Sequence, residues 1–140
     1  KDAAALTRAL SAAAPDGVHC YFENVGGMHL EAALNCIAMG ARIALCGMIS
    51  MYNNAEPEPG PPNLINLFGR SALAQGFIVS IYLHLAPQFA FEVAPMLAAG
   101  KIKFRESVYD GLAEAPNAFI GLFHGENFGK AVIRVGPDRL

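Results

Sequence analysis

The stretch VHCYFENVGGMHLEAALNCIAMGARIALCGM, residues 18–48, decides the fold of this chain. It opens with β-branched and aromatic residues, which are typical of a buried strand, and a strand is predicted over 18–24. From Met28 apolar residues recur at helical spacing, and Gly40 stands where a glycine often ends a helix, so a helix is predicted between them. A second strand is predicted over 42–48. A strand, a helix and a strand in this order are typical of a βαβ unit with a parallel sheet.

The sequence on both sides of this unit continues the alternation of helices and strands. Upstream, Asp2 is a candidate N-cap of a helix that Pro15–Gly17 ends. Downstream, the segment ISMYNNAEPEPGPP is predicted to form a long loop over 49–62, and Asn63 is predicted to cap a helix that Gly76 ends. The remaining predicted elements are a strand over 77–83, a helix over 89–100, a half-buried strand within 101–111, a helix over 115–123 and a strand over 130–135.

The composition narrows the class of protein. The chain has 140 residues, of which 54% are hydrophobic and 16% are charged, so it can bury the core of one ordinary domain. A net charge of -2 argues against nucleic acid or an anionic membrane as a partner. No apolar run is long enough to span a bilayer. The three cysteines form no CxxC pair and their number is odd, which favours a reducing compartment, and a cytoplasmic location is expected.

Candidate binding residues follow the predicted strands. In a parallel sheet ligands bind beyond the carboxyl ends of the strands, where Gly26 and Gly27 would let a ligand approach the backbone. Asn24 could hydrogen-bond a ribose or a nicotinamide amide, or it could serve only as a turn residue that caps the next helix. The sequence contains neither GxGxxG nor GxxxxGK[ST].

Tyr52 lies in the long loop, and two interpretations of it stay open. Its hydroxyl could position a ligand above a strand end, or its ring could simply fold against the protein body. Residue 56 is a glutamate, so Tyr52 lacks the lysine four positions later that would lower the pKa of a catalytic tyrosine. The four histidines show no metal-ligand spacing, and no metal site is predicted.

Four segments together resemble a known family. CYFENVGG, LCGMISMYNN, PNLINL with QGFIVS, and ENFGKAVIRVG are similar in order and spacing to the zinc-independent medium-chain dehydrogenase/reductase superfamily. The resemblance is to its leukotriene 12-hydroxydehydrogenase/15-oxoprostaglandin 13-reductase branch, which includes alkenal and curcumin reductases, and to the carboxyl-terminal part only. The chain starts at Lys1 without a methionine, and the isolated chain is expected to be incomplete and inactive.

The resemblance implies a fold. Residues 1–100 would form the second half of a Rossmann doubly wound parallel sheet of the α/β class. Residues 101–140 would be a carboxyl-terminal tail that returns to complete the catalytic domain.

The resemblance also implies a reaction and a set of site residues. The family transfers a hydride from NADPH to the C=C bond of an α,β-unsaturated carbonyl compound, without zinc, so NADP(H) is the expected cofactor and an enone or enal the expected substrate. Tyr52 would act in catalysis by fixing the nicotinamide ribose. The cofactor-binding residues would be Asn24, Cys46, Gly47, Met48, Ile49, Ser50, Tyr52, Phe77, Ile78, Val79 and Asn127.

Two other functions stay open on the sequence. The protein could be a quinone oxidoreductase of the same superfamily, or a non-catalytic α/β module that binds a ligand in the same cleft.

A homodimer is also expected, because the apolar strand predicted over 77–83 would lie at an open sheet edge and could pair with its copy in a second subunit. Alternatively, a loop of the same chain could cover that edge.

Overall fold

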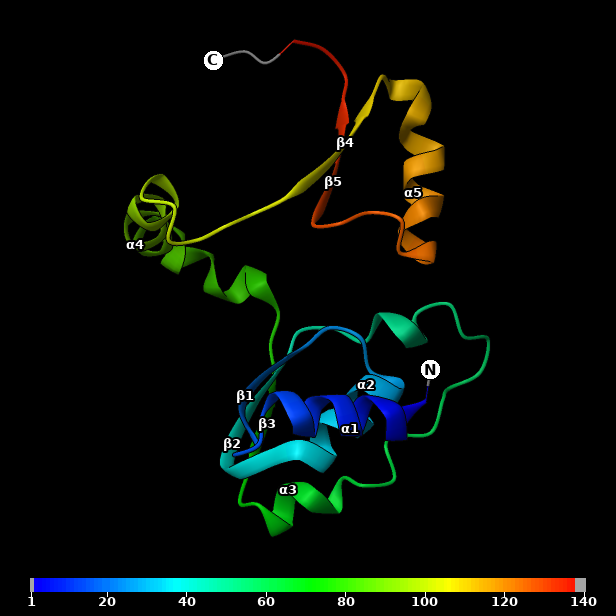
Figure 1. The fold of residues 1–140 in the computed structure, drawn as a ribbon, viewed down its shortest axis with the longest axis vertical. Coiled ribbons are helices and arrows are strands. Elements are labelled where there is room, and N and C mark those ends of the chain that lie inside the picture. The colour runs from blue at the N-terminus through cyan, green and yellow to red at the C-terminus, as the bar shows by residue number, and fades with distance from the viewer. Residues whose placement is uncertain (1, 138–140) are drawn as a thin grey trace. The chain divides into compact units, whose positions relative to one another are not determined.

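The computed structural model describes residues 2–137, which divide into two compact units (Figure 1). One unit ends at His84 and the other begins at Leu85. The elements of the first unit are α1 (Ala3–Ala13), β1 (Val18–Glu23), α2 (Gly27–Cys36), β2 (Ile37–Leu45), the 3₁₀ turn η1 (Ile49–Met51), α3 (Ile65–Gly69), β3 (Leu73–Gly76) and most of the 3₁₀ segment η2 (Val79–Leu85). The elements of the second unit are α4 (Ala86–Ala98), β4 (Glu106–Asp110), η3 (Leu112–Glu114), α5 (Ala115–His124) and β5 (Lys130–Arg134). The domain boundary near residue 100 stays a prediction.

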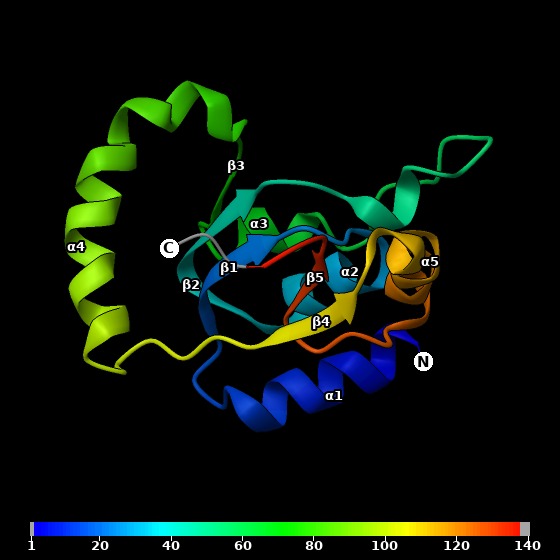
Figure 2. The ribbon, with the colours of Figure 1, turned by 90° about the horizontal axis from the view of Figure 1, so that it is seen from above.

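The first unit is built on a parallel sheet in the order β1-β2-β3, as the sequence predicts (Figure 2). Cys20 pairs with Arg42 and Glu23 with Leu45, and Leu45 in turn pairs with Gly76 of β3. The three strands therefore end side by side, which brings the segments that follow them to one edge of the sheet. The α/β class with a sequential parallel sheet is confirmed.

One face of this sheet carries the core. Leu30 and Leu34 of α2 pack on Ile37, Ala41 and Ile43 of β2, and all five side chains are at most 5% exposed. The alternation along β2 explains the pattern, since residues two apart point to the same face. The first helix packs on α2 and begins at Asp2, whose carboxylate accepts a 2.6 Å hydrogen bond from the Ala5 N–H, as predicted for an N-cap.

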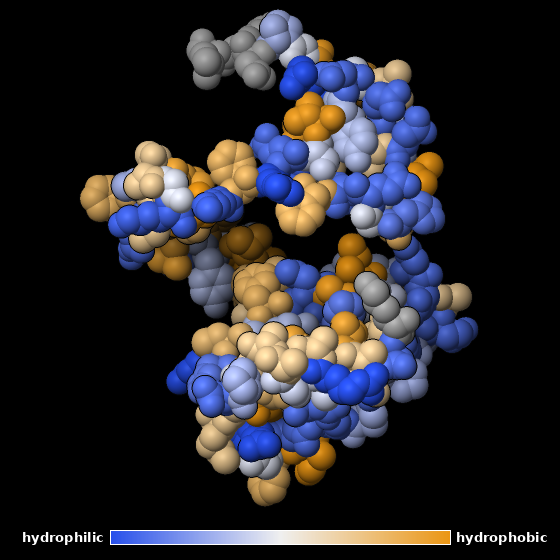
Figure 3. Space-filling view, in the orientation of Figure 1, coloured by the Kyte–Doolittle hydropathy of each residue, from blue (hydrophilic) through white to orange (hydrophobic). Residues whose placement is uncertain are grey.

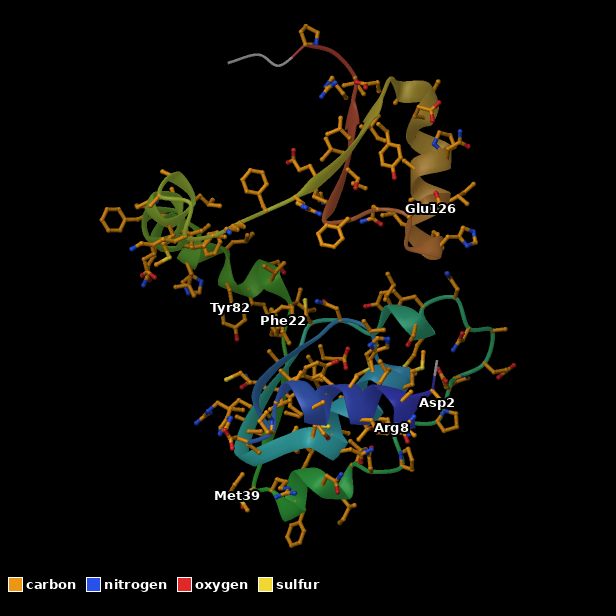
Figure 4. All side chains as sticks on the ribbon, in the orientation of Figure 1. Asp2, Arg8, Phe22, Met39, Tyr82 and Glu126 are labelled. Carbon is orange, nitrogen blue, oxygen red and sulfur yellow. The ribbon has the colours of Figure 1, made fainter. Side chains whose placement is uncertain are left out.

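The other face of the sheet carries exposed apolar side chains within the first unit (Figure 3). Phe22 is 58% exposed there and meets Phe77 edge to face, with ring centroids 5.8 Å apart. Phe77 contacts Tyr82 in the same way at 5.9 Å, and Figure 4 labels Phe22 and Tyr82 on this unit. These rings border an open hollow of about 560 Å³ whose floor includes Cys20 and Leu73.

The predicted strand over 77–83 is wrong. The third strand is β3, four residues earlier, and the segment from Val79 forms the 3₁₀ segment η2. The Phe77 N–H still donates to the Leu45 carbonyl at 3.2 Å, but β2 ends there and its next amides bond toward β1. A strand needs a neighbour to satisfy its backbone, so the chain after Phe77 satisfies its amides locally instead. An apolar run by itself does not separate these two outcomes.

Two predicted helices are shorter in the structure. The helix expected over 28–40 ends at Cys36, because the β-branched Ile37 is already extended and pairs with Val18. Gly40, at φ 70°, lies in a bulge of β2 and donates to the Arg70 carbonyl at 2.7 Å, so it does not end a helix. The helix expected between its cap Asn63 and Gly76 is shortened to α3, because β3 already begins at Leu73.

The second unit pairs β4 with β5 in parallel beside α5. The helix predicted over 115–123 and the strand predicted over 130–135 are confirmed, whereas β4 begins only at Glu106. Gly129, at φ 78°, has no room for a side chain because a Cβ there would clash with the Arg105 carbonyl. No helix within residues 2–137 is long and apolar enough to cross a membrane.

The contribution of the core to the free energy of unfolding can be tested at Leu34. The substitution Leu34→Ala should lower the free energy of unfolding by about 2–5 kcal/mol, since Leu34 is 1% exposed and its removal leaves a cavity. Urea unfolding of the protein measures this loss. The matched control Leu64→Ala removes the same atoms from a side chain that is 51% exposed, and should lower the free energy by less than about 1 kcal/mol. Equal losses for the two variants would contradict the assigned core.

Candidate functional site at the carboxyl edge of the sheet

The turn after β1 is organised by Glu23, whose side chain is fully buried. Its Oε1 atom accepts hydrogen bonds from the N–H groups of Val25, at 2.5 Å, and Gly26, at 2.9 Å. A buried carboxylate is tolerated only when such donors compensate its lost hydration. The Glu23 side chain thus fixes the turn that carries Asn24.

The loop after β2 is joined to this turn by four backbone hydrogen bonds. The N–H groups of Cys46 and Gly47 donate to the Glu23 carbonyl at 2.9 and 3.1 Å. Ile49 donates to the Asn24 carbonyl and Ser50 to the Val25 carbonyl, both at 2.9 Å. This set of bonds, here called the edge ladder, makes one unit of two segments that lie more than twenty residues apart in sequence.

Gly26 and Gly27 make room for this loop. A Cβ on Gly26 would lie 3.0 Å from the Cβ of Met48 and 3.3 Å from the Ser50 Oγ, and a Cβ on Gly27 would also lie 3.3 Å from that Oγ. Gly26 has φ 78° and ψ −161°, a region that is essentially reserved for glycine. The group that comes close to the glycine pair is therefore the chain's own loop, through Met48 and Ser50.

Tyr52 folds back over the same loop. Its hydroxyl oxygen accepts a 3.1 Å hydrogen bond from the Met48 N–H, and a Cβ on Gly47 would lie 2.7 Å from that oxygen. Because the oxygen is the acceptor, the hydroxyl hydrogen is left to donate elsewhere. The residue as a whole is 66% exposed, and its hydroxyl donates no hydrogen bond to the described residues. The folded-back position of Tyr52 agrees with one interpretation, and the free donor leaves the other one open.

The other predicted residues divide between the two units. Asn24 is exposed, and its side-chain amide makes no hydrogen bond to the residues that the structure describes. Phe77 follows β3 and bonds to the end of β2, so Phe77, Ile78 and Val79 continue from the same sheet edge. Asn127 lies in the second unit, where its Nδ2 donates to the Gly129 carbonyl at 2.7 Å. Asn24, the loop 46–52 and Phe77 therefore lie at the carboxyl ends of the strands of the first unit, and the roles of all the predicted site residues stay predictions.

The sequence interpretation assigned no role to Glu23. The signal was present, because an acid directly before a glycine-containing turn at a strand end can accept from the turn's amides. What the sequence did not indicate is that this acid is buried and that its carbonyl also receives the next strand's loop. No group of three or more histidine, cysteine or acidic residues among the described residues could hold a metal ion.

Tyr21 lies two residues before Glu23 on the same strand. Burial raises the pKa of Tyr21 to about 12, and the negative charge of Glu23 and its side-chain contact act in the same direction. That contact does not meet standard hydrogen-bond geometry, and the Oε2 atom of Glu23 is buried with no hydrogen-bond partner among the described residues.

The sequence and the fold are similar to those of several reductases. The chain is 44% identical to the NADP(+)-dependent 2-alkenal reductase of Nicotiana tabacum over 95% of its own length and 38% of the relative. It is 42% identical to the NADPH-dependent curcumin reductase of Escherichia coli, over 92% of its length and 39% of that relative. The crystal structure of CurA from Vibrio vulnificus in complex with NADPH superposes with a TM-score of 0.82 at 39% identity, covering 94% of this chain and 41% of CurA.

The chain thus spans about two fifths of the length of the proteins it matches. No family model matches the sequence.

The glycine turn can be tested by Gly26→Ala. This change should lower the free energy of unfolding by about 1–3 kcal/mol, because alanine is strained at this φ and ψ and its methyl group meets Met48. The control Gly60→Ala adds a methyl group where no atom lies within 4 Å, and should leave stability unchanged or slightly higher. If urea unfolding gave similar losses for both, the turn would not have the geometry described.

Tyr21 should make stability fall in alkaline solution. The pKa is higher in the folded protein than the ordinary value of 10, so the neutral form is favoured by folding. This contribution is complete below pH 10 and is lost as the pH rises toward 12, by on the order of 1–2 kcal/mol after solvent screening. Unfolding free energies measured across this range should fall less steeply in Tyr21→Phe. An identical slope in both proteins would contradict the assignment.

Proposed function

We propose that the whole protein is an NADPH-dependent reductase of the C=C bond in α,β-unsaturated carbonyl compounds. The proposal starts from the homology of this chain to known reductases. The chain is homologous to alkenal and curcumin reductases of the zinc-independent medium-chain dehydrogenase/reductase superfamily. The observation that carries the proposal is the edge ladder, which joins the turn of Asn24 to the loop 46–52 at the carboxyl ends of β1 and β2. Beside it, at the end of β3, the Phe77 N–H donates to the Leu45 carbonyl. Open α/β sheets bind nucleotides at such an edge.

The residues at this edge fit the nicotinamide half of the cofactor. The free amide of Asn24 offers donors and an acceptor to a ribose or a carboxamide, and the Tyr52 hydroxyl offers a donor. Ile78 and Val79 add apolar surface, at 66% and 65% exposed. In this proposal Asn24 and Tyr52 orient the nicotinamide riboside, while Cys46–Ser50 form the wall behind it.

The reaction divides between the cofactor and the chain. When bound, NADPH supplies a hydride for the β-carbon of the substrate, whose α-carbon then takes a proton. The chain's part is to orient the reactants and to place a donor where negative charge develops on the carbonyl oxygen. Tyr52 would contribute to this with its free hydroxyl hydrogen, either directly or through the ribose that it would hold.

The test is an assay of the natural full-length protein with NADPH and a set of acceptors. We expect oxidation of NADPH with a 2-alkenal or an enone, and a saturated carbonyl product. Turnover with a quinone in place of the enone would favour the quinone oxidoreductase alternative. Binding of NADPH without consumption of any acceptor would favour a non-catalytic module and would overturn the proposal.

The role of Tyr52 makes a quantitative prediction. Tyr52→Phe removes the hydroxyl, and loss of one hydrogen bond of ~1–3 kcal/mol should lower kcat/KM by roughly tenfold to a hundredfold without unfolding the protein. Gly47→Ala should give a similar loss, because its methyl group displaces the Tyr52 hydroxyl. Since both changes act on the same group, the double variant should be no worse than either single variant. Additive losses in steady-state kinetics would show that the two residues act separately.

We propose further that the protein forms a homodimer, through β3 and the segment after it. Within the described residues β3 pairs on one side with β2 and forms the edge of the sheet on the other. The exposed apolar side chains that follow, including Ile81 at 67%, would be buried by a second copy. Ile81→Lys should then produce monomers in sedimentation, whereas Phe68→Lys, at another exposed apolar site, should not. A wild-type monomer at high concentration would refute the dimer.

The compartment we propose is the cytoplasm, where thiols stay reduced. The three cysteines are free, and Cys20 and Cys46 are exposed. Localisation of a tagged full-length protein by microscopy tests this.

A further inference from the structure

Glu23 is fully buried and its hydrogen bonds organise the edge of the sheet, yet the proposed reaction gives its carboxylate no part. Two acceptor groups of Glu23 each accept two backbone hydrogen bonds. Oε1 accepts from the N–H groups of Val25 and Gly26, and the main-chain carbonyl accepts from those of Cys46 and Gly47. Four amides from two loops thus converge on one residue. The bonds from Ile49 and Ser50 to the turn then continue the edge ladder outward.

The two oxygens of the carboxylate differ. Oε1 accepts both amide hydrogen bonds, while Oε2 is buried and has no hydrogen-bond partner among the described residues, since the contact of the carboxylate with Tyr21 does not meet standard hydrogen-bond geometry. If the negative charge were the feature in use, a partner on the second oxygen would be expected, because a buried charge is stabilised by pairing. The observed contacts need only one acceptor atom at the position of Oε1.

We propose that Glu23 is a positioning residue: by accepting the two turn amides, its Oε1 atom gives the turn the shape on which the loop 46–52 docks. A neutral acceptor atom at the position of Oε1 would do the same. This inference rests on the proposed function, since the docked loop is where the cofactor would lie. Through the turn, Glu23 sets where the Asn24 amide and the Tyr52 hydroxyl stand relative to each other. It contacts neither cofactor nor substrate in this role.

Two variants separate the acceptor from the charge. Glu23→Gln keeps the length and an acceptor oxygen, removes the charge, and puts an amide group where Oε2 has no hydrogen bond to lose. Glu23→Met keeps the approximate length and fills the space but leaves the amides of Val25 and Gly26 without an acceptor. The control Asp2→Ala removes another carboxylate that accepts from the backbone, at the start of α1.

Amide hydrogen exchange is the first readout, because it does not depend on the cofactor. In Glu23→Met, exchange at Val25, Gly26, Ile49 and Ser50 should rise about tenfold or more, as expected for loss of a hydrogen bond that holds a local structure. In Glu23→Gln it should stay within about threefold of the wild type. In Asp2→Ala it should rise only at the start of α1.

The second readout is NADPH binding by the natural full-length protein. The Kd for NADPH should rise about tenfold in Glu23→Met and stay near the wild-type value in Glu23→Gln, in line with the hydrogen exchange.

Two results would overturn the inference. One is unchanged exchange at Ile49 and Ser50 in Glu23→Met. The other is exchange and NADPH binding in Glu23→Gln that change as much as in Glu23→Met, which would assign the role to the charge. If Glu23→Met does not fold, Glu23→Gln alone still decides between acceptor and charge. If exchange changes as expected but the wild type binds no NADPH, the positioning role stands and the proposed function falls.

Discussion

The structure of the first unit depends on one constraint, which is that buried backbone amides and buried acceptor atoms must be paired with one another. Glu23 sits at the end of β1 with no exposure to solvent, and the donors within reach are the amides of the turn that follows. Meeting that need bends the chain into the turn from which α2 starts. The same residue's carbonyl then receives the end of β2, so the strand ends and the loops beyond them are fixed together.

The length of the sheet follows from this arrangement. Because the amides of Cys46 and Gly47 turn toward β1, β2 offers its last carbonyl at Leu45 and nothing beyond it. The third strand can pair only as far as Gly76, with one more bond from Phe77, and the apolar run after it winds into a 3₁₀ segment. A local event at β1 thereby decides the conformation of residues that are more than fifty positions away in sequence.

Some groups of the site are already used by contacts within the chain. Met48 and Ser50 occupy the space beside Gly26 and Gly27, and the Tyr52 hydroxyl oxygen accepts a hydrogen bond from the Met48 N–H. These contacts are internal and make the loop rigid. In the proposed site, the groups left to recognise a ligand are the side-chain amide of Asn24 and the hydroxyl hydrogen of Tyr52.

The sequence alone determined the α/β class, the sequential parallel order of the strands, the first helix with its Asp2 cap, and the kinship to reductases, because periodicity, capping and motif order are local properties of the chain. It also identified Asn24 as a strand-end residue and Tyr52 as a residue of the loop after the next strand, since such positions can be read from the alternation of elements.

Only the tertiary structure decided where β2 and β3 begin and end, that Gly40 bends a strand, and that Glu23 holds the site together. Each of these is set by a hydrogen-bond partner far away in the sequence, such as Arg70 for Gly40 or Cys46 for Glu23, and local propensity carries no information about such partners.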